Sequence, residues 1–170
     1  QKYPEVLRVN DMGIRRKFGT RHNHCFTSPL YRQKVYLINE QLADRYKDHP
    51  GLALWHVSNE YSGACYCDAC REAFINWLKF KFDNNLDALN KAWNTSFWSH
   101  TYTKWHQIDP PSSIGEKLVN GQNIDWKRFT TAQTIDFFKA ETVPLKKFTS
   151  DIPITTNLMG LFEGLDNIKV

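Results

Sequence analysis

The sequence lacks any run of about 18 apolar residues, so it predicts no membrane-spanning helix. Its first residues, QKYPEVLRVND, are polar and lack the basic and then apolar order of a secretory signal. Internal repeats and low-complexity segments are absent as well. The net charge of +4 is too small to favour a protein that binds nucleic acid through a strongly basic surface. We therefore expect a cytoplasmic protein with no membrane or nucleic-acid partner.

Aromatic residues, by contrast, are abundant. The chain has six tryptophans and eleven phenylalanines among its 170 residues, and its apolar content of 41% is ordinary for a folded protein. This composition disfavours disorder, and the length allows one domain with a sizeable core.

Apolar spacing and chain breakers divide the sequence into helices, strands and loops. The segment SPLYRQKVYLINEQLADRYKDH predicts a helix, with Ser28 as its N-cap and Pro29 in the first helical position. The short apolar run LALWHVS is typical of a strand buried on both faces. The predicted elements are a loop over 1–27, a helix over 28–49, a strand over 52–60, a cysteine segment over 61–70, helices over 71–93, a loop over 94–122, a helix over 123–149 with a kink at Pro144, and a strand over 152–160.

Strands that alternate with helices indicate a parallel α/β architecture. Two strands alone cannot cover both of their faces, and a complete eight-stranded α/β barrel needs about 250 residues. The pattern therefore predicts part of a larger α/β fold.

Four cysteines form a candidate metal site. Three of them follow a C-x-C-x2-C pattern, and the set is Cys25, Cys65, Cys67 and Cys70. Sulfurs so close in sequence can converge on one ion with little loop-closure cost, and four of them suit a tetrahedral structural zinc site. Buried free thiols and disulfides are the alternatives, and His22 or His24 could replace a cysteine as ligand. A zinc ion here would tie the loop at Cys25 to the segment after the first strand without taking part in chemistry.

The dipeptide Asn59-Glu60 lies at the carboxyl end of the first predicted strand. In parallel α/β folds, functional side chains gather at the carboxyl ends of strands. Glu60 is therefore a candidate general acid, and Asn59 a candidate donor to a substrate hydroxyl. The alternative is that Glu60 pairs with an arginine or caps the next segment.

A basic run, IRRKFGTRHNH, covers residues 14–24. Such a run is typical of a solvated loop, but it can also contact a phosphate or supply an arginine that binds a polyol. A rival function follows from it: a zinc-stapled module that binds nucleic acid or carbohydrate without catalysis, in which Arg15, Arg16, Lys17 and Arg21 surround the metal.

Five motifs together resemble glycoside hydrolase family 42, the microbial β-galactosidases. In chain order they are FGTRHNHC, WHVSNEY, CYCDACREAFINWLKFKF, LDALNKAWNTSFWS and TTNLMG. The resemblance covers nearly the whole chain and implies a partial (β/α)8 TIM barrel, from after strand 3 to strand 5, with 52–60 as strand 4 and 152–160 as strand 5. It also implies a bacterial enzyme that hydrolyses terminal β-D-galactosyl residues with retention and forms a homo-oligomer, with a trimer as the candidate assembly.

The resemblance assigns roles to individual residues. Glu60 matches the catalytic acid/base, while Arg21, Asn59 and Trp98 match residues that bind the sugar or line its pocket. The structural Zn²⁺ ligands match Cys25, Cys65, Cys67 and Cys70. The family's nucleophile is a glutamate at the end of strand 7, which Glu163 does not match. We therefore expect this 170-residue chain to supply the acid/base but not the nucleophile, and to be inactive when isolated.

Overall fold

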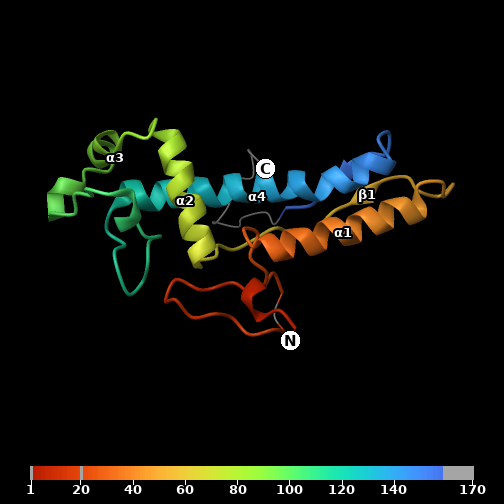
Figure 1. The fold of residues 1–170 in the computed structure, drawn as a ribbon, viewed down its shortest axis with the longest axis horizontal. Coiled ribbons are helices and arrows are strands. Elements are labelled where there is room, and N and C mark those ends of the chain that lie inside the picture. The colour runs from red at the N-terminus through yellow and green to blue at the C-terminus, as the bar shows by residue number, and fades with distance from the viewer. Residues whose placement is uncertain (1, 20, 159–170) are drawn as a thin grey trace.

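The structure is a computed structural model that describes residues 2–19 and 21–158, apart from the side chain of Trp98. Figure 1 shows its elements in order along the chain. They are η1 (Pro4–Val6), α1 (Pro29–Tyr46), β1 (Trp55–His56), α2 (Asp68–Lys81), α3 (Leu86–Trp93), η2 (Thr95–Trp98), η3 (Trp105–Gln107), α4 (Asn120–Phe148) and β2 (Ile154–Thr155).

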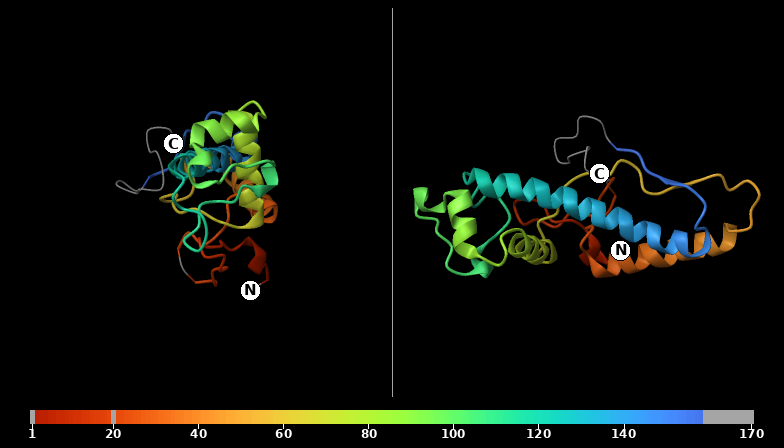
Figure 2. Two further views of the ribbon diagram at one scale, coloured as in Figure 1. Left: turned by 90° about the vertical axis from the view of Figure 1, so that its left-hand side faces the viewer. Right: turned by 90° about the horizontal axis from the view of Figure 1, so that it is seen from above.

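Helix α4 is the long axis of the molecule, and the other elements pack along it. Helix α1 lies beside its C-terminal half, while α2 and α3 lie towards its N-terminal end (Figures 1 and 2). Ion pairs join α1 to α4, with Arg32 2.6 Å from Asp136 and Lys147 2.7 Å from Glu40. This arrangement places the two ends of α4 in different surroundings.

The helix boundaries differ modestly from the predicted ones. Helix α1 starts at Pro29, after a Ser28 side chain that accepts a hydrogen bond from the backbone N–H of Tyr31 at 3.3 Å. Helix α4 begins at Asn120, three residues before the predicted start, and it continues beyond Pro144 to Phe148. None of the described helices is long and apolar enough to cross a membrane.

The two strands pair in parallel, with Trp55 opposite Ile154 and His56 opposite Thr155. Each spans two residues, so the strands predicted over 52–60 and 152–160 were too long; residues 159 and 160 lie outside the described part. The prediction of burial on both faces was also wrong, because Leu54 is 50% exposed and only Val57 is buried between residues 52 and 60. In the described part of the chain each strand pairs only with the other, which leaves the outer edge of each strand unpaired.

The predicted loops contain short regular pieces. In the first loop, residues 1–27, Leu7 bridges His24 and Val9 bridges Arg15, both antiparallel. The second loop, residues 94–122, includes η2, η3 and the first residues of α4. These pieces fix the course of segments that carry several of the candidate residues.

Apolar residues are buried mainly around α2, α3 and the first half of α4. The cysteines belong to this core, together with Phe74, Leu78, Trp93, Trp126 and Phe129. A smaller cluster of Phe26, Tyr61 and Phe137 packs next to the end of β1. The core thus reaches the segment that follows the first strand.

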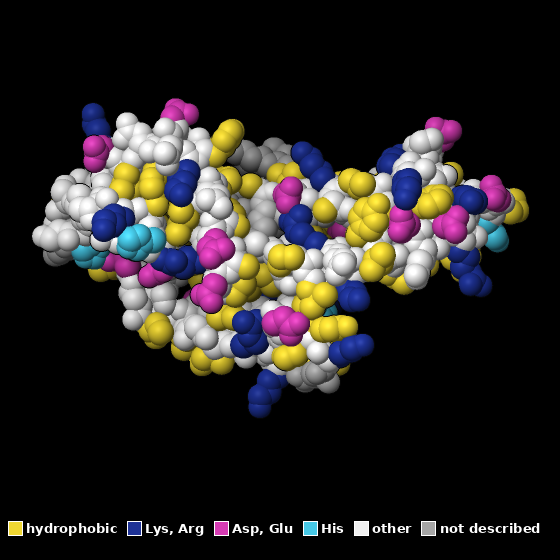
Figure 3. Space-filling view, in the orientation of Figure 1, with side chains coloured by type: hydrophobic (Ala, Val, Ile, Leu, Met, Phe, Trp, Pro, Cys, Tyr) yellow, Lys and Arg dark blue, Asp and Glu magenta, His cyan; other side chains and the backbone are white. Residues whose placement is uncertain are grey.

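The apolar side chains of α1 are largely uncovered. Leu37, Ile38 and Leu42 are 41%, 51% and 37% exposed, and Ala43 is the buried residue of this helix. Apolar side chains are visible on the surface over α1 in Figure 3. Within the described residues, α1 packs against α4 alone to any large extent, so the rest of its apolar stripe has no cover.

Candidate functional site

Asn59 and Glu60 occupy a tight turn just after β1, at its carboxyl end. Ser58 and Glu60 both have left-handed backbone conformations, with φ of 54° and 53°. The Glu60 N–H donates to the backbone oxygen of Asn157 at 3.1 Å, so the turn is fastened to the segment after β2. Non-glycine residues held in this region cost about 1–3 kcal/mol and occur often at functional sites.

Arg21 reaches this turn from the N-terminal loop. Its Nη2 lies 2.9 Å from Oε2 of Glu60, and the two side chains are 70% and 30% exposed. The structure therefore brings together two residues that the sequence proposed separately. The ion pair also confirms the alternative prediction that Glu60 pairs with an arginine.

A cavity of about 150 Å³ opens beside the turn. Its lining consists of His22, His24, Phe26, Tyr31, Ser58, Asn59 and Tyr61. Burial lowers the pKa of both histidines, and the Arg21 and Arg8 charges lower that of His22 further, with Arg8 doing the same for His24. Both imidazoles are therefore neutral near pH 7 and can donate and accept hydrogen bonds, as a sugar hydroxyl requires.

Sequence reasoning missed Glu141, a buried carboxylate on α4. Ser58 donates to Glu141 at 2.9 and 3.0 Å, and the Tyr61 hydroxyl donates to it as well. A signal was available: Phe137, Glu141 and Leu145 follow one another at intervals of four, which places a carboxylate in an apolar helical stripe.

The four cysteines converge as the sequence predicted. Their sulfurs all lie within 4.8 Å of one another, and Cys25 Sγ is 3.4 Å from Cys70 Sγ and 3.7 Å from Cys67 Sγ. None of the four cysteines forms a disulfide, whose sulfurs would be about 2.05 Å apart. The distances fit zinc, because a tetrahedron with Zn–S bonds of about 2.3 Å has sulfur–sulfur edges of about 3.8 Å.

The surroundings of the sulfurs also suit a cation. Hydrogen bonds among the four thiols lower the pKa of Cys65 to about 7 and lower that of Cys67, and they raise the pKa of Cys25 and Cys70, so Cys65 and Cys67 are the first to become thiolates. The backbone N–H of Val9 donates to Cys65 Sγ at 3.4 Å. The four-cysteine set could thus hold a metal ion, and His22 and His24 lie in the cavity lining instead.

Arg8 links the cysteine site to the candidate turn, and sequence reasoning missed it too. The side chain is 3% exposed, and it donates through Nε to the His24 oxygen at 2.8 Å and through Nη1 to the Ser62 oxygen. These two carbonyls belong to the segments that lead to Cys25 and to Cys65. Arg8 therefore joins the loop before Cys25 to the loop after Glu60.

Trp98 is not brought near this turn. It ends η2, which follows α3 directly, and Gly121 at the start of α4 touches Trp93 of α3. Ser58 contacts Glu141, 20 residues further along α4, a separation of about 30 Å at a rise of about 1.5 Å per residue. Figures 1 and 2 show α3 and β1 at opposite ends of α4.

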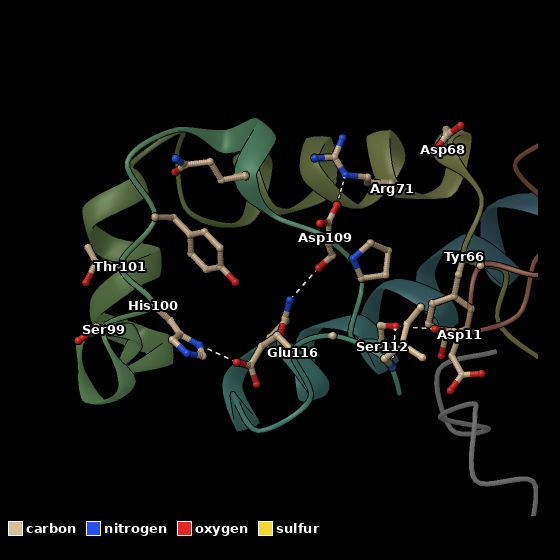
Figure 4. A pocket seen from close by; sticks show the side chains of 17 residues that line it. Asp11, Tyr66, Asp68, Arg71, Ser99, His100, Thr101, Asp109, Ser112 and Glu116 are labelled. Atoms are coloured by element: carbon tan, nitrogen blue, oxygen red, sulfur yellow. Dashed lines mark hydrogen bonds and ion pairs between the residues drawn. The ribbon is translucent and has the colours of Figure 1, made fainter.

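A second cavity, of about 650 Å³, is lined by residues of the 94–122 loop and of α2, together with Asp11, Gly13 and Tyr66 (Figure 4). Arg71 pairs there with Asp109, and His100 Nδ1 lies 2.6 Å from Glu116 Oε2. Its lining contains none of the predicted site residues. Of the predicted site residues, Asn59 lines the smaller cavity beside β1 instead.

Comparisons with known proteins agree on one family. The family model of the glycoside hydrolase family 42 β-galactosidases matches residues 1–170. β-Galactosidase BglY of Alicyclobacillus acidocaldarius is 58% identical, over 97% of this chain and 24% of BglY. β-Galactosidase GanA of Bacillus subtilis is 54% identical, over 99% of this chain and 26% of GanA. The structure of Gan42B, a β-galactosidase of this family from G. stearothermophilus, is 60% identical with a TM-score of 0.97, over 99% of this chain and 25% of that one.

These relatives are glycoside hydrolases, and the described fold is a mixed α/β segment that superimposes on part of one. The chain belongs to glycoside hydrolase family 42, the β-galactosidases. It spans about a quarter of the length of the relatives that it matches.

Proposed function

We propose that this chain is the segment of a retaining β-galactosidase barrel that carries the general acid/base, Glu60. In this proposal β1 belongs to strand 4 and β2 to strand 5 of the (β/α)8 barrel. One observation carries it: Glu60 follows the carboxyl end of a parallel strand, beside a small polar cavity and within reach of Arg21. The exposed faces of the strand pair and of α1 also suit a barrel that further strands and helices would complete.

Retaining hydrolysis needs two carboxyl groups about 5–5.5 Å apart. Glu60 would protonate the departing glycosidic oxygen while a second carboxylate, supplied by a later strand of the complete protein, attacks the anomeric carbon. Glu60 would then take a proton from the water that hydrolyses the glycosyl-enzyme. The isolated segment would be inactive because it holds one of the two carboxyl groups.

Arg21 and Asn59 would bind sugar hydroxyls beside Glu60. The Arg21 pair is exposed, and exposed ion pairs contribute only about 0–1 kcal/mol. A bound galactoside could therefore draw Arg21 away from Glu60 at little cost, which would also free the carboxyl group to carry a proton. The same pair would keep the site organised before substrate arrives.

A zinc ion held by the four cysteines would brace this site. When bound, it would supply a fixed tetrahedral link and no chemistry, since four sulfurs leave no open coordination position. Cys25 comes from the loop that follows Arg21, and Cys65 from the loop that follows Glu60. Their convergence would therefore fix the relative positions of the two loops that carry the sugar-binding and acid/base side chains.

Trp98 can serve as a sugar contact in this proposal only across a subunit boundary, because α4 separates η2 from Glu60 by about 30 Å. The homo-oligomer implied by the family would provide that boundary. Co-expressed Glu60→Ala and Trp98→Ala chains test this, because a mixed oligomer pairs an intact Glu60 with an intact Trp98. Activity above that of either variant alone supports the trans contact, and its absence removes Trp98 from the site.

The acid/base role is tested in the full-length protein with Glu60→Ala and Glu60→Gln. A general acid contributes about 10²–10⁴-fold, so both variants should lose that much kcat/KM on a galactoside with a poor leaving group. Azide should restore turnover of an activated galactoside by Glu60→Ala, since a small anion can replace the base-activated water. Glu72→Ala, which removes an exposed glutamate of α2, is the control. Full activity of Glu60→Ala would remove Glu60 from this role.

A further inference from the structure

One buried carboxylate holds both residues that flank the Asn-Glu pair. Glu141 projects from α4 and is 6% exposed. The Ser58 hydroxyl lies 2.9 Å from its Oε1 and 3.0 Å from its Oε2, and the Tyr61 hydroxyl donates to Oε2. Asn59 and Glu60 thus lie between two residues whose hydroxyls donate to the same carboxylate, that of Glu141.

We propose that Glu141 is the positioning residue of this segment: its carboxylate fixes Ser58 and Tyr61 and thereby sets the direction of the Glu60 side chain. The inference rests on the acid/base role proposed above for Glu60. Glu141 acts through its two hydroxyl partners and takes no part in proton transfer.

The backbone of the segment needs such a support. Ser58 and Glu60 both adopt left-handed conformations, which non-glycine residues keep only where their surroundings hold them. On one side the Ser58 side chain is bound to Glu141. On the other side the Glu60 N–H donates to the Asn157 oxygen at 3.1 Å. The turn is therefore clamped between α4 and the segment after β2.

The charge of Glu141 depends on this segment in turn. Burial raises the pKa of Glu141, and the hydrogen bonds from Tyr61 and Ser58 oppose that rise. No Lys, Arg or His forms an ion pair with Glu141 among residues 2–19 and 21–158. The Ser58 and Tyr61 hydroxyls are thus the side-chain donors to the buried Glu141 carboxylate. These hydrogen bonds stabilise the carboxylate and hold the two hydroxyls in place.

The contact also shapes the cavity beside Glu60. Ser58, Asn59 and Tyr61 all line it, and Tyr61 is 2% exposed within the cluster that includes Phe26 and Phe137. Loss of the Glu141 carboxylate would leave the buried Tyr61 hydroxyl without this acceptor and release the turn from α4. Misplacement of a reacting group by about 1 Å can cost about 100-fold in rate.

The test uses the full-length β-galactosidase and the leaving group of its substrate. Loss of positioning at a general acid should slow the release of a poor leaving group much more than that of 2,4-dinitrophenolate, which departs with little protonation. We expect Glu141→Ala to lower kcat/KM by about 100-fold on phenyl β-galactoside and by less than about 10-fold on the 2,4-dinitrophenyl substrate. Glu141→Gln keeps the shape and one acceptor oxygen, so it should recover part of this loss.

Matched variants separate positioning from general damage. Thr134→Val alters another buried polar residue of α4, whose hydroxyl donates to the Thr130 oxygen at 2.9 Å. This variant should leave kcat/KM unchanged on both substrates. If Glu141→Ala does not fold, Ser58→Ala and Tyr61→Phe replace it, because each removes one of the two hydroxyls that donate to Glu141. Each should lower kcat/KM more on phenyl β-galactoside than on the 2,4-dinitrophenyl substrate. Equal losses on both substrates, or no loss, would overturn the positioning role.

A parallel measurement on Glu60→Gln keeps this inference distinct from the proposed function. If Glu60→Gln shows a loss that depends on the leaving group and the Glu141 variants do not, only the inference fails. If Glu60→Gln retains full activity on both substrates, the acid/base proposal fails and the positioning inference fails with it.

Discussion

Arg21 and Glu60 lie 39 positions apart in the sequence, and their side chains meet at 2.9 Å. The N-terminal loop is folded back onto the end of β1, because Arg8 and the cysteines fasten it there. A guanidinium and a carboxylate that meet at such a strand end form an exposed polar site. The pair is exposed enough to open.

The first prediction concerns this pair. Arg21→Ala in the full-length enzyme should raise KM for a galactoside by about 10–100-fold, the effect of losing a charged hydrogen bond of about 1.5–3 kcal/mol. Thermal stability should hardly change, since an exposed ion pair contributes about 0–1 kcal/mol. Steady-state kinetics and a melting curve measure the two effects. Arg16→Ala, an exposed arginine of the same loop, is the control, and an unchanged KM in Arg21→Ala would show that Arg21 only pairs with Glu60.

The second prediction concerns the metal. The purified protein should contain about one zinc ion per chain, and Cys70→Ser should lose it. Cys70 is fully buried and lies among the three other sulfurs, so loss of the metal should destabilise the protein by more than about 4 kcal/mol. Elemental analysis and thermal unfolding measure these effects, and zinc added after chelation should restore the stability. Four thiols that react freely with a thiol reagent in the native protein would contradict a zinc site.

The third prediction compares two glycines with the same backbone conformation. Gly63 and Gly13 both have φ of 77°, so alanine is strained equally at either position. A Cβ at Gly63 would overlap the Arg8 guanidinium, whereas a Cβ at Gly13 has no neighbour within 4 Å. Arg8 is buried and held by two carbonyls, so it cannot move aside cheaply.

We therefore expect Gly13→Ala to cost about 1–2 kcal/mol and Gly63→Ala to cost about 1–3 kcal/mol more. Chemical unfolding of the two variants measures the difference, which isolates the contact with Arg8. Equal losses in both variants would mean that Arg8 yields, and that it does not fix the loop after Glu60.

Features that are marked by a short sequence motif were predicted correctly. The cysteine spacing predicted a cluster, and the cluster is present; the Asn-Glu pair was placed at a strand end, where it lies. The contacts of Arg8 and Glu141 were missed because each side chain bonds to a segment more than 50 residues away. The spacing of Glu141 in an apolar helical stripe indicates that it is buried, but it does not identify its partners. Strand length and strand burial were overestimated because an apolar run does not encode which elements pair with a strand, and among the described residues each strand pairs only with the other.

The last prediction follows from the buried carboxyl of Glu141. Burial raises its pKa above the usual 4.5, although the hydrogen bonds from Tyr61 and Ser58 oppose the shift. A folded state that holds this proton more tightly than the unfolded state gains stability at low pH and loses it as pH rises through the folded pKa. Glu141→Gln has no proton to release, so the difference in melting temperature between variant and wild type should shift in favour of the variant as pH rises from about 4.5. Thermal unfolding over pH 4–8 measures this, with Thr134→Val as the control whose difference stays constant. A constant difference for Glu141→Gln would mean that its pKa does not change on folding.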